Sequence, residues 1–126
     1  MPFIHIKSLP FEEEFDISNT IVNIATDFSN RTGIELRHIH TTWEFYLPGN
    51  YAKGDEVAEY QPKEGYPIIV DLLSPDFNEL KIITVMLESI ADSISEQLDF
   101  PKNNIFINHR QAHSAMVFDD GNVVKW

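Results

Sequence analysis

The sequence contains no cysteine, and this absence excludes several kinds of chemistry. Without cysteine the chain has no disulfide framework, no thiolate nucleophile and no cysteine-ligated metal site. It also has no apolar run near the roughly 20 residues that a membrane-spanning helix needs. The first residues, MPFIHIK, lack the basic-then-apolar order of a signal peptide. Together these absences predict a cytoplasmic protein with no membrane partner.

Basic residues are scarce as well. The chain has 9 lysines and arginines against 20 aspartates and glutamates, so its formal net charge is -11. Binding to nucleic-acid phosphates needs a basic face, and we therefore expect no nucleic-acid partner. One arginine in a pocket is nevertheless enough to bind a carboxylate, so the charge does not exclude a small acidic ligand.

The sequence has no phosphate-binding loop, dinucleotide fingerprint or nucleophile elbow. Its most informative residue is Pro2, directly after Met1. A methionine before a small residue is normally removed in the cell, which would leave Pro2 with a free secondary amine. An α-amine titrates near ~8, and burial in an apolar pocket lowers that pKa because desolvation disfavours the charged form. Pro2 is therefore a candidate general base near neutral pH, on a ring that fixes its φ angle.

The first half of the chain, residues 2–47, has the pattern of a β-α-β unit. Alternating residues predict a strand over 2–9. One apolar stripe predicts a helix over 17–31 that ends at Gly33. A second strand is predicted over 36–47, and one of its faces is polar, with His38, His40, Thr42, Glu44 and Tyr46.

Residues 67–110 repeat this plan after a glycine- and proline-rich loop over 48–66. The strand predicted over 68–73 is apolar on both sides except for Asp71, which is typical of a central strand. Ser74 and Pro75 predict the start of a long helix that ends before Pro101. A last main strand is predicted over 104–110. Residues 114–126 are predicted to close as a hairpin around the turn 119–122.

The order β-α-β, loop, β-α-β, hairpin predicts a single α/β (α+β) domain over residues 1–126. Helical crossovers favour parallel strands within each half, so both helices are expected on one face of one mixed sheet. The other face would carry the polar residues of the second strand. A sheet with one uncovered, semi-polar face predicts oligomerisation.

A proline behind the initiator methionine, two β-α-β units and the segment Ile105-Phe106-Ile107-Asn108 resemble the tautomerase superfamily of macrophage migration inhibitory factor and 4-oxalocrotonate tautomerase. A closer similarity is to an uncharacterised bacterial branch, through Tyr66-Pro67, Asp71 and Phe118-Asp119-Asp120-Gly121. The resemblance implies a homotrimer with sheets inside, helices outside and active sites near Pro2 at subunit boundaries. It implies that Pro2 shuttles a proton on a small enol or 2-oxo carboxylic acid, or assists a lyase or hydration step. No cofactor and no metal are expected.

The resemblance also indicates substrate-binding residues. Asn108 stands where an asparagine lines the family's active site, and Phe106 stands where the family has a tyrosine. Phe106, Asn108 and Arg110 alternate on one face of the last main strand, so Arg110 is a candidate for bidentate binding of a carboxylate. Its alternative role is a surface ion pair with one of the many acids. Glu44 is a candidate for orienting a water, or a solvated residue without a role.

Departures from the family keep other functions open. Where the family has an arginine on the first helix, this chain has an acidic stretch from Glu12 to Asp16, and the nearest arginine, Arg31, lies at the far end. Ile34 replaces a family lysine. One alternative is therefore a non-catalytic trimer that binds a small ligand or a protein. Another is a ferredoxin-like regulatory domain, which shares the β-α-β-β-α-β order.

Histidines and tyrosines supply two further hypotheses. His38 and His40, with Glu44 on the same predicted strand face, can chelate a metal, although a polar interface ladder explains the pattern better. His109 and His113 have no serine or acid partner that the sequence identifies. Tyr51 and Tyr60 place aromatic rings in the loop 48–66, which either covers a pocket or a neighbouring subunit, or is a solvated excursion.

Overall fold

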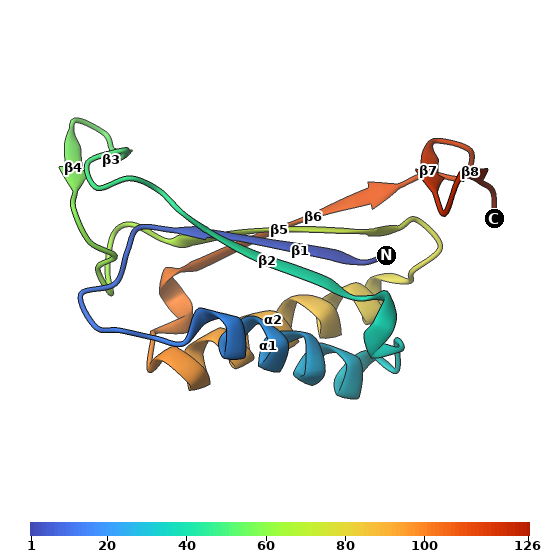
Figure 1. The fold of residues 1–126 in the computed structure, drawn as a ribbon, viewed down its shortest axis with the longest axis horizontal. Coiled ribbons are helices and arrows are strands. Elements are labelled where there is room, and N and C mark those ends of the chain that lie inside the picture. Colours follow the sequence, from blue (N-terminus) through green and yellow to red (C-terminus); the bar gives the residue numbers. More distant parts are fainter.

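The computed structural model describes residues 1–126 and has two layers, a four-stranded sheet and a pair of helices packed on one of its faces (Figure 1). The elements follow in the order β1 Phe3–Ser8, α1 Ile17–Thr32, η1 Leu36–His38, β2 His40–Phe45, β3 Tyr51–Lys53, β4 Glu56–Ala58, β5 Ile68–Pro75, α2 Leu80–Leu98, η2 Lys102–Asn104, β6 Ile105–Ala112, β7 Val117–Asp119 and β8 Asn122–Val124. Neither helix is long and apolar enough to cross a membrane.

The four long strands lie in the order β2-β1-β5-β6. β1 and β2 are parallel, β5 and β6 are parallel, and the two central strands β1 and β5 are antiparallel. This confirms the predicted mixed sheet with both helices on one face. The strands of each β-α-β unit are direct neighbours, whereas a split β-α-β unit of the ferredoxin-like kind has another strand between them. The regulatory-domain alternative is therefore wrong.

The core lies between the sheet and the helices. Alternate residues of the two central strands, such as Ile4 and Leu72, point toward the helices and are fully buried. They meet a stripe on each helix, represented by Phe28 on α1 and Ile90 on α2. Burial of one such side chain stabilises the fold by about 1.5–3 kcal/mol, so this layer holds the sheet in register.

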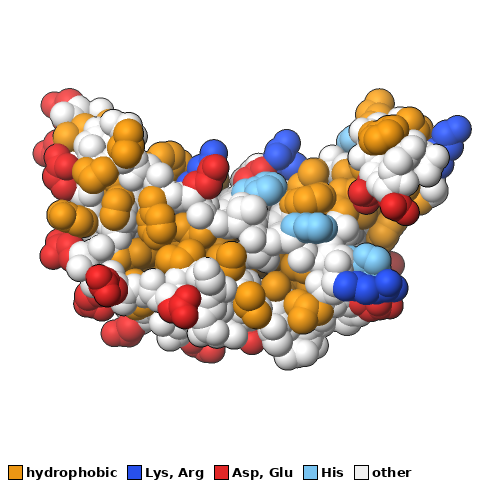
Figure 2. Space-filling model, in the orientation of Figure 1, with side chains coloured by type: hydrophobic (Ala, Val, Ile, Leu, Met, Phe, Trp, Pro, Cys, Tyr) orange, Lys and Arg blue, Asp and Glu red, His pale blue; other side chains and the backbone are white.

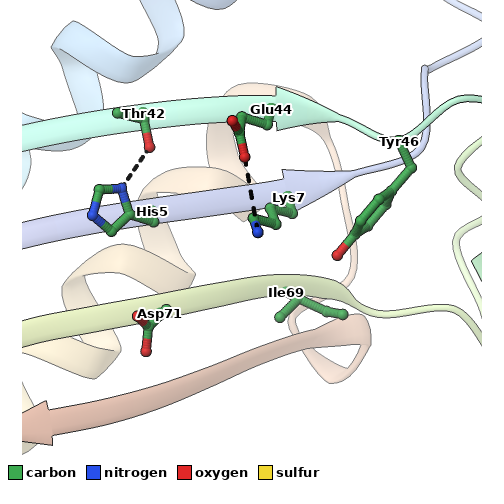
Figure 3. A pocket seen from close by; sticks show the side chains of 7 residues that line it. All are labelled: His5, Lys7, Thr42, Glu44, Tyr46, Ile69 and Asp71. Carbon is green, nitrogen blue, oxygen red and sulfur yellow. Dashed lines mark hydrogen bonds and ion pairs between the residues drawn. The ribbon is translucent and has the colours of Figure 1, made fainter.

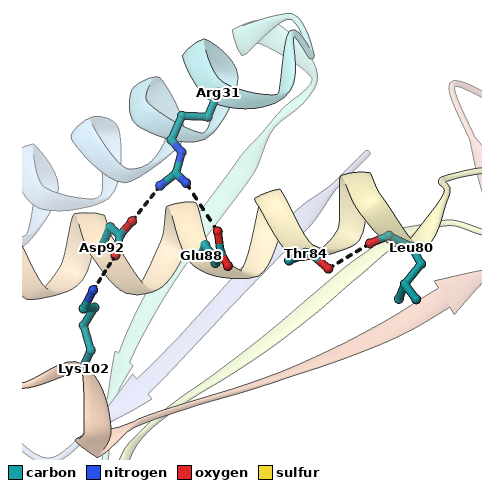
Figure 4. Close-up of polar contacts among 6 residues, drawn as sticks. All are labelled: Arg31, Leu80, Thr84, Glu88, Asp92 and Lys102. Carbon is teal, nitrogen blue, oxygen red and sulfur yellow. Dashed lines mark hydrogen bonds and ion pairs between the residues drawn. The ribbon is translucent and has the colours of Figure 1, made fainter.

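Local signals explain where α1 begins and ends. The Asp16 carboxylate accepts a hydrogen bond from the Asn19 N–H at 3.1 Å, which satisfies a free donor of the first turn. Gly33 ends the helix in the left-handed conformation, with φ 77°, and its N–H donates to the Ser29 carbonyl. On the outer side, Arg31 binds Asp92 and Glu88 of α2 and thereby joins the two helices (Figure 4).

The prediction that Ser74 and Pro75 start the second helix is wrong. Both residues belong to β5, and α2 begins at Leu80 after a turn. The Asp76 N–H donates to the Ala112 carbonyl on β6, so the nitrogen of Pro75 faces the other side. Pairing with β1 has already ended there, at Leu73. The missing N–H of proline therefore interrupts no ladder hydrogen bond.

Two further expectations are corrected by the structure. Residues 36–38 form the short helix η1 rather than the start of a strand, so His38 does not share a strand face with His40. The predicted loop 48–66 contains the β3–β4 hairpin. The predicted closing hairpin is confirmed as β7–β8.

Buried amides hold the segment after the β3–β4 hairpin in place. The Gln61 side chain accepts a hydrogen bond from the Leu9 N–H at 3.1 Å and donates to the carbonyl of Tyr66. The Asn104 side chain donates to the same Tyr66 carbonyl at 3.2 Å. The Tyr51 hydroxyl donates to the Pro67 carbonyl at 2.8 Å, and burial raises the pKa of this hydroxyl, which keeps it a neutral donor. The segment is therefore fastened to the end of the sheet.

The two hairpins rise at opposite ends of the sheet, on the face away from the helices (Figure 1). In the space-filling view they stand above a lower middle where basic, acidic and histidine side chains lie together (Figure 2). The uncovered face of the sheet is therefore concave.

Candidate functional site

A hollow of about 540 Å³ lies on the uncovered face of the sheet (Figure 3). Strands β1, β2 and β5, together with Tyr46 just after β2, supply its side chains, which include charges of both signs. Its lining residues are His5, Lys7, Thr42, Glu44, Tyr46, Ile69 and Asp71. Because successive residues of a strand point to opposite faces, every second residue of β1, β2 and β5 reaches this face. We call this face the outer sheet face.

Asp71 and Arg110 form the strongest polar contact of the outer sheet face. The Arg110 Nε donates to Asp71 Oδ1 at 2.9 Å, and Nη2 donates to Oδ2. The hydrogen bond from Arg110 is the main cause that lowers the pKa of Asp71, and a contact with Asn108 adds to it. The guanidinium has five N–H donors, and this geometry leaves the Nη1 side free. Arg110 is thus paired with Asp71 and still has donors for a second acceptor.

The other charged residues of the hollow are loosely held. Glu44 lies 3.8 Å from Lys7, with its carboxylate largely exposed, and such an exposed pair contributes ~1 kcal/mol at most. His5 shares a hydrogen bond with Thr42, from Nδ1 to Oγ1 at 2.8 Å. Phe106, on β6, also lies on the outer sheet face, and 57% of its surface is exposed. Glu44 and Phe106 are therefore accessible to a ligand on the outer sheet face.

Pro2 lies at the start of the central strand β1, and its side chain is fully buried. Its carbonyl accepts a hydrogen bond from the His40 N–H at 3.1 Å. The register places Phe3 beside Leu73 and Leu73 beside Arg110, so Arg110 is the candidate residue at the Pro2 end of the sheet. Glu44 lies four residues further along β2 than His40, which pairs with Phe3. The structure thus groups Asn108 and Arg110 on the Pro2 side of the sheet, outside the lining of the hollow, and Glu44 is the one predicted site residue that lines the hollow.

Two histidines have partners that the sequence did not identify. Nε2 of His109 lies 2.7 Å from the hydroxyl of Ser74, which is fully buried on the helix side of β5. Nδ1 of His113 lies 3.0 Å from Asp76, a residue of the turn after β5. Both contacts join residues more than 30 positions apart, so spacing along the chain carries no sign of them. The only sequence signal for the first is a serine and a histidine at inward positions of apolar strands.

The histidine pair His38 and His40 does not form a chelate. His40 lies in β2 and stacks on Phe3 with 4.6 Å between ring centroids, whereas His38 belongs to η1. No group of three or more histidine, aspartate or glutamate side chains is placed to hold a metal ion.

No protein-family model and no curated protein matches the chain. Solved structures do match it. A native fused 4-OT (4-oxalocrotonate tautomerase) has a TM-score of 0.80 and 10% sequence identity, over 96% of this chain and 94% of that one. A member of the cis-3-chloroacrylic acid dehalogenase family has a TM-score of 0.76 and 10% identity, over 97% and 82%.

A macrophage migration inhibitory factor-like protein from Entamoeba histolytica matches with a TM-score of 0.68 and 13% identity, over 96% of each chain. Two of the matched fused 4-OT structures are described as asymmetric trimers. At identities this low, the likeness establishes the fold, which the chain shares with these proteins over nearly its whole length.

Proposed function

Because the chain has the fold of the tautomerase superfamily, we propose that it is an isomerase-like enzyme that uses Pro2 on a small enol or 2-oxo carboxylic acid. The proposal requires removal of Met1, which converts the Pro2 amide nitrogen into a secondary amine. The observation that carries it is the place of Pro2, buried at the start of the central strand. No cofactor is needed for this proton transfer.

The proposed chemistry divides into three roles. The Pro2 amine takes a proton from the carbon beside the substrate carbonyl and returns it to another carbon, so the same group is base and then acid. Arg110 binds the substrate carboxylate through the donors that Asp71 leaves free. The Asn108 amide donates to the enolate oxygen, and Phe106 supplies an apolar wall beside it. Glu44 orients a water in the hydration variant of this chemistry.

We also propose that the protein is a cytoplasmic homotrimer in which the outer sheet face of each subunit is turned toward the centre of the trimer. Large apolar side chains are exposed on or beside this face, among them Phe106, Phe118 and Val57. Matched structures are described as trimers, which supports the same arrangement here. Substrate would then bind where one subunit meets the next.

The first test is the intact mass of the protein from its native host, followed by Pro2→Ala. We expect a mass without methionine, and turnover of enol or 2-oxo acids that Pro2→Ala reduces, because alanine keeps an α-amine but lacks the ring that holds the secondary amine rigidly. A leucine inserted between Met1 and Pro2 is the matched control, because methionine is retained before a bulky residue and the Pro2 nitrogen then stays an amide. This variant should lose ~10²-fold or more of the turnover, the contribution of a positioned general base. Full turnover by this variant would rule out Pro2 as the base.

A non-catalytic trimer that binds a small ligand or a protein is the second candidate. The observation in its favour is that Asp71 already occupies much of the carboxylate-binding edge of Arg110. If the native protein retains Met1, the Pro2 nitrogen is an amide and cannot act as a base, and the binding function would replace the enzyme as the proposal.

A further inference from the structure

The hollow on the outer sheet face holds two charged side chains that the chain itself leaves without a close partner. Lys7 Nζ and Glu44 Oε2 are 3.8 Å apart, which is longer than a hydrogen bond, and 48% and 72% of these side chains are exposed. Asp71 and Arg110 on the same face differ from them, because they bind each other through two nitrogens. The ammonium of Lys7 and the carboxylate of Glu44 are therefore both available to a ligand.

The strand register places an apolar wall beside these two charges. Lys7 on β1 pairs with Glu44 on β2 and with Ile69 on β5, so the three residues form one row across the sheet. Tyr46, just after β2, extends toward Ile69 (Figure 3). Its ring meets the ring of Tyr51 edge-on, with 5.6 Å between the centroids, and is thereby held in place. This end of the hollow thus offers a cation, an anion and an apolar wall.

The four permanent charges on and beside the hollow cancel. Lys7 faces Glu44, and the charge of Asp71 is matched by Arg110. A ligand with a charge of only one sign pairs with Lys7 or with Glu44 and is repelled by the other, whereas a ligand with one charge of each sign pairs with both. An α-amino acid carries its ammonium and its carboxylate on one carbon, so both groups reach two charges that lie this close together. The volume of about 540 Å³ is in the range of small-molecule sites.

We propose that the hollow binds a small zwitterion, an α-amino acid with an apolar or aromatic side chain. Its carboxylate accepts hydrogen bonds from the Lys7 ammonium, and its ammonium donates to the Glu44 carboxylate. Its side chain packs against Tyr46 and Ile69. This binding goes beyond the proposed function, because it uses neither the Pro2 nitrogen nor the removal of Met1. In the proposed trimer the hollow lies on the face turned toward the centre, and the bound amino acid lies between the subunits.

The test is a titration of the ¹⁵N-labelled full chain with L-phenylalanine, followed through the chemical shifts of the backbone amides. We expect the shifts to concentrate in β1, β2 and the first half of β5. The ligands 3-phenylpropionate and phenethylamine each lack one of the two charged groups and should bind about tenfold more weakly, the effect of losing a hydrogen bond between charged groups. Lys7→Met and Glu44→Gln should each weaken binding of L-phenylalanine by about the same factor.

The matched control is Glu88→Gln. Glu88 lies 3.9 Å from Arg31 in an equally loose and exposed pair, but on the helix layer, so this variant should bind L-phenylalanine like the wild type. The two partial ligands assign the contacts, because Lys7→Met should not change the affinity for phenethylamine and Glu44→Gln should not change that for 3-phenylpropionate. No shifts at the hollow, equal affinities for L-phenylalanine and 3-phenylpropionate, or an equal loss in Glu88→Gln would overturn the proposal.

Discussion

The Asp71–Arg110 pair determines how strongly a ligand carboxylate can bind on the outer sheet face. Asp71 accepts from both Nε and Nη2 of Arg110, and an incoming carboxylate has to use the remaining donors. The pair lies across β5 and β6, between Asn108 and the start of β1. At the scale of the residue, the affinity of the site therefore depends on competition between Asp71 and the ligand for one guanidinium.

Replacing Asp71 with asparagine tests this competition. We expect Asp71→Asn to tighten binding of a small 2-oxo acid such as pyruvate by about tenfold, because a gain of 1.4 kcal/mol from a released arginine corresponds to that factor. Isothermal titration calorimetry measures the change. Asp92→Asn is the control, since it removes the same charge from an aspartate that binds Arg31 and Lys102 on the helix side. Equal affinities for the two variants would mean that Arg110 does not bind the ligand.

At the scale of the element, the β7–β8 hairpin is fixed by one carboxylate. Asp76 accepts a hydrogen bond from the indole N–H of Trp126 at 2.7 Å and also contacts His113. The Trp126 bond is the main cause that lowers the pKa of Asp76, followed by His113. Folding thus lowers the pKa of the Asp76 carboxyl below its usual value of about 4. The charged carboxylate therefore stabilises the folded contact with Trp126 in full above pH ~4. This stabilisation is lost as the pH falls further, through the lower pKa of the folded state.

We therefore expect acid to release the C-terminal residue. In a Trp43→Phe background, where Trp126 is the only tryptophan, its fluorescence should be constant from pH 7 to about 4 and change below that. Asp76→Ala should show the released signal already at pH 7. If its spectrum at pH 7 equals that of the background protein, Asp76 does not hold Trp126.

A second prediction at this scale concerns the segment between β4 and β5. Gln61 and Asn104 are buried amides that bind its backbone, and the Gln61 oxygen also accepts from the N–H of the fully buried Leu9. A buried N–H left without its acceptor costs about 1–3 kcal/mol. Gln61→Ala is expected to lower the free energy of unfolding in urea by that amount and to speed amide exchange in β3 and β4. Asn103→Ala removes an exposed amide from the same short helix as Asn104 and should change neither. Slow exchange in Gln61→Ala would show that the hairpin is held by other contacts.

The elements that sequence patterns predicted well are those whose signals are local. The apolar stripe and Gly33 define α1, and the turn at 119–122 defines the last hairpin. The helix start predicted at Ser74 and Pro75 is wrong because a serine followed by proline also fits the end of a strand. Proline has no N–H, but β1 no longer pairs with β5 at Pro75, so no hydrogen bond of the sheet is lost there. The local sequence does not show where this pairing ends. Contacts across the sheet, such as Ser74 with His109, depend on register and leave no trace in local sequence.

The same reasoning separates the predicted site residues. The alternation of β6 correctly places Asn108 and Arg110 on one face, but only the sheet order shows that Asp71 lies beside them. Glu44 shares that face, although register places it away from Pro2. Whether these residues act on a substrate is a property of the assembled site and stays a prediction.

At the scale of the whole molecule, charge and shape point to different partners for the two faces. The helix layer carries the ion-paired network around Arg31 and Asp92, which suits solvent (Figure 4). The hairpins beside the outer sheet face carry exposed apolar side chains, including Phe118 on β7 with 73% exposure. Exposed apolar groups that gather on one side of a protein mark an interaction surface. We therefore expect copies of the chain to meet through the outer sheet face.

Sedimentation equilibrium tests this expectation through mass. We expect wild-type protein at three times the chain mass of 14.5 kDa. Phe118→Glu should shift the population toward monomer, because an unpaired charge is costly to bury in an interface. Val22→Glu places the same charge on an exposed apolar residue of α1 and should leave the trimer intact. Circular dichroism checks that both variants keep their helices. A wild-type monomer, or equal masses for both folded variants, would show that the outer sheet face does not join the subunits, and the site would then have to be complete within one chain.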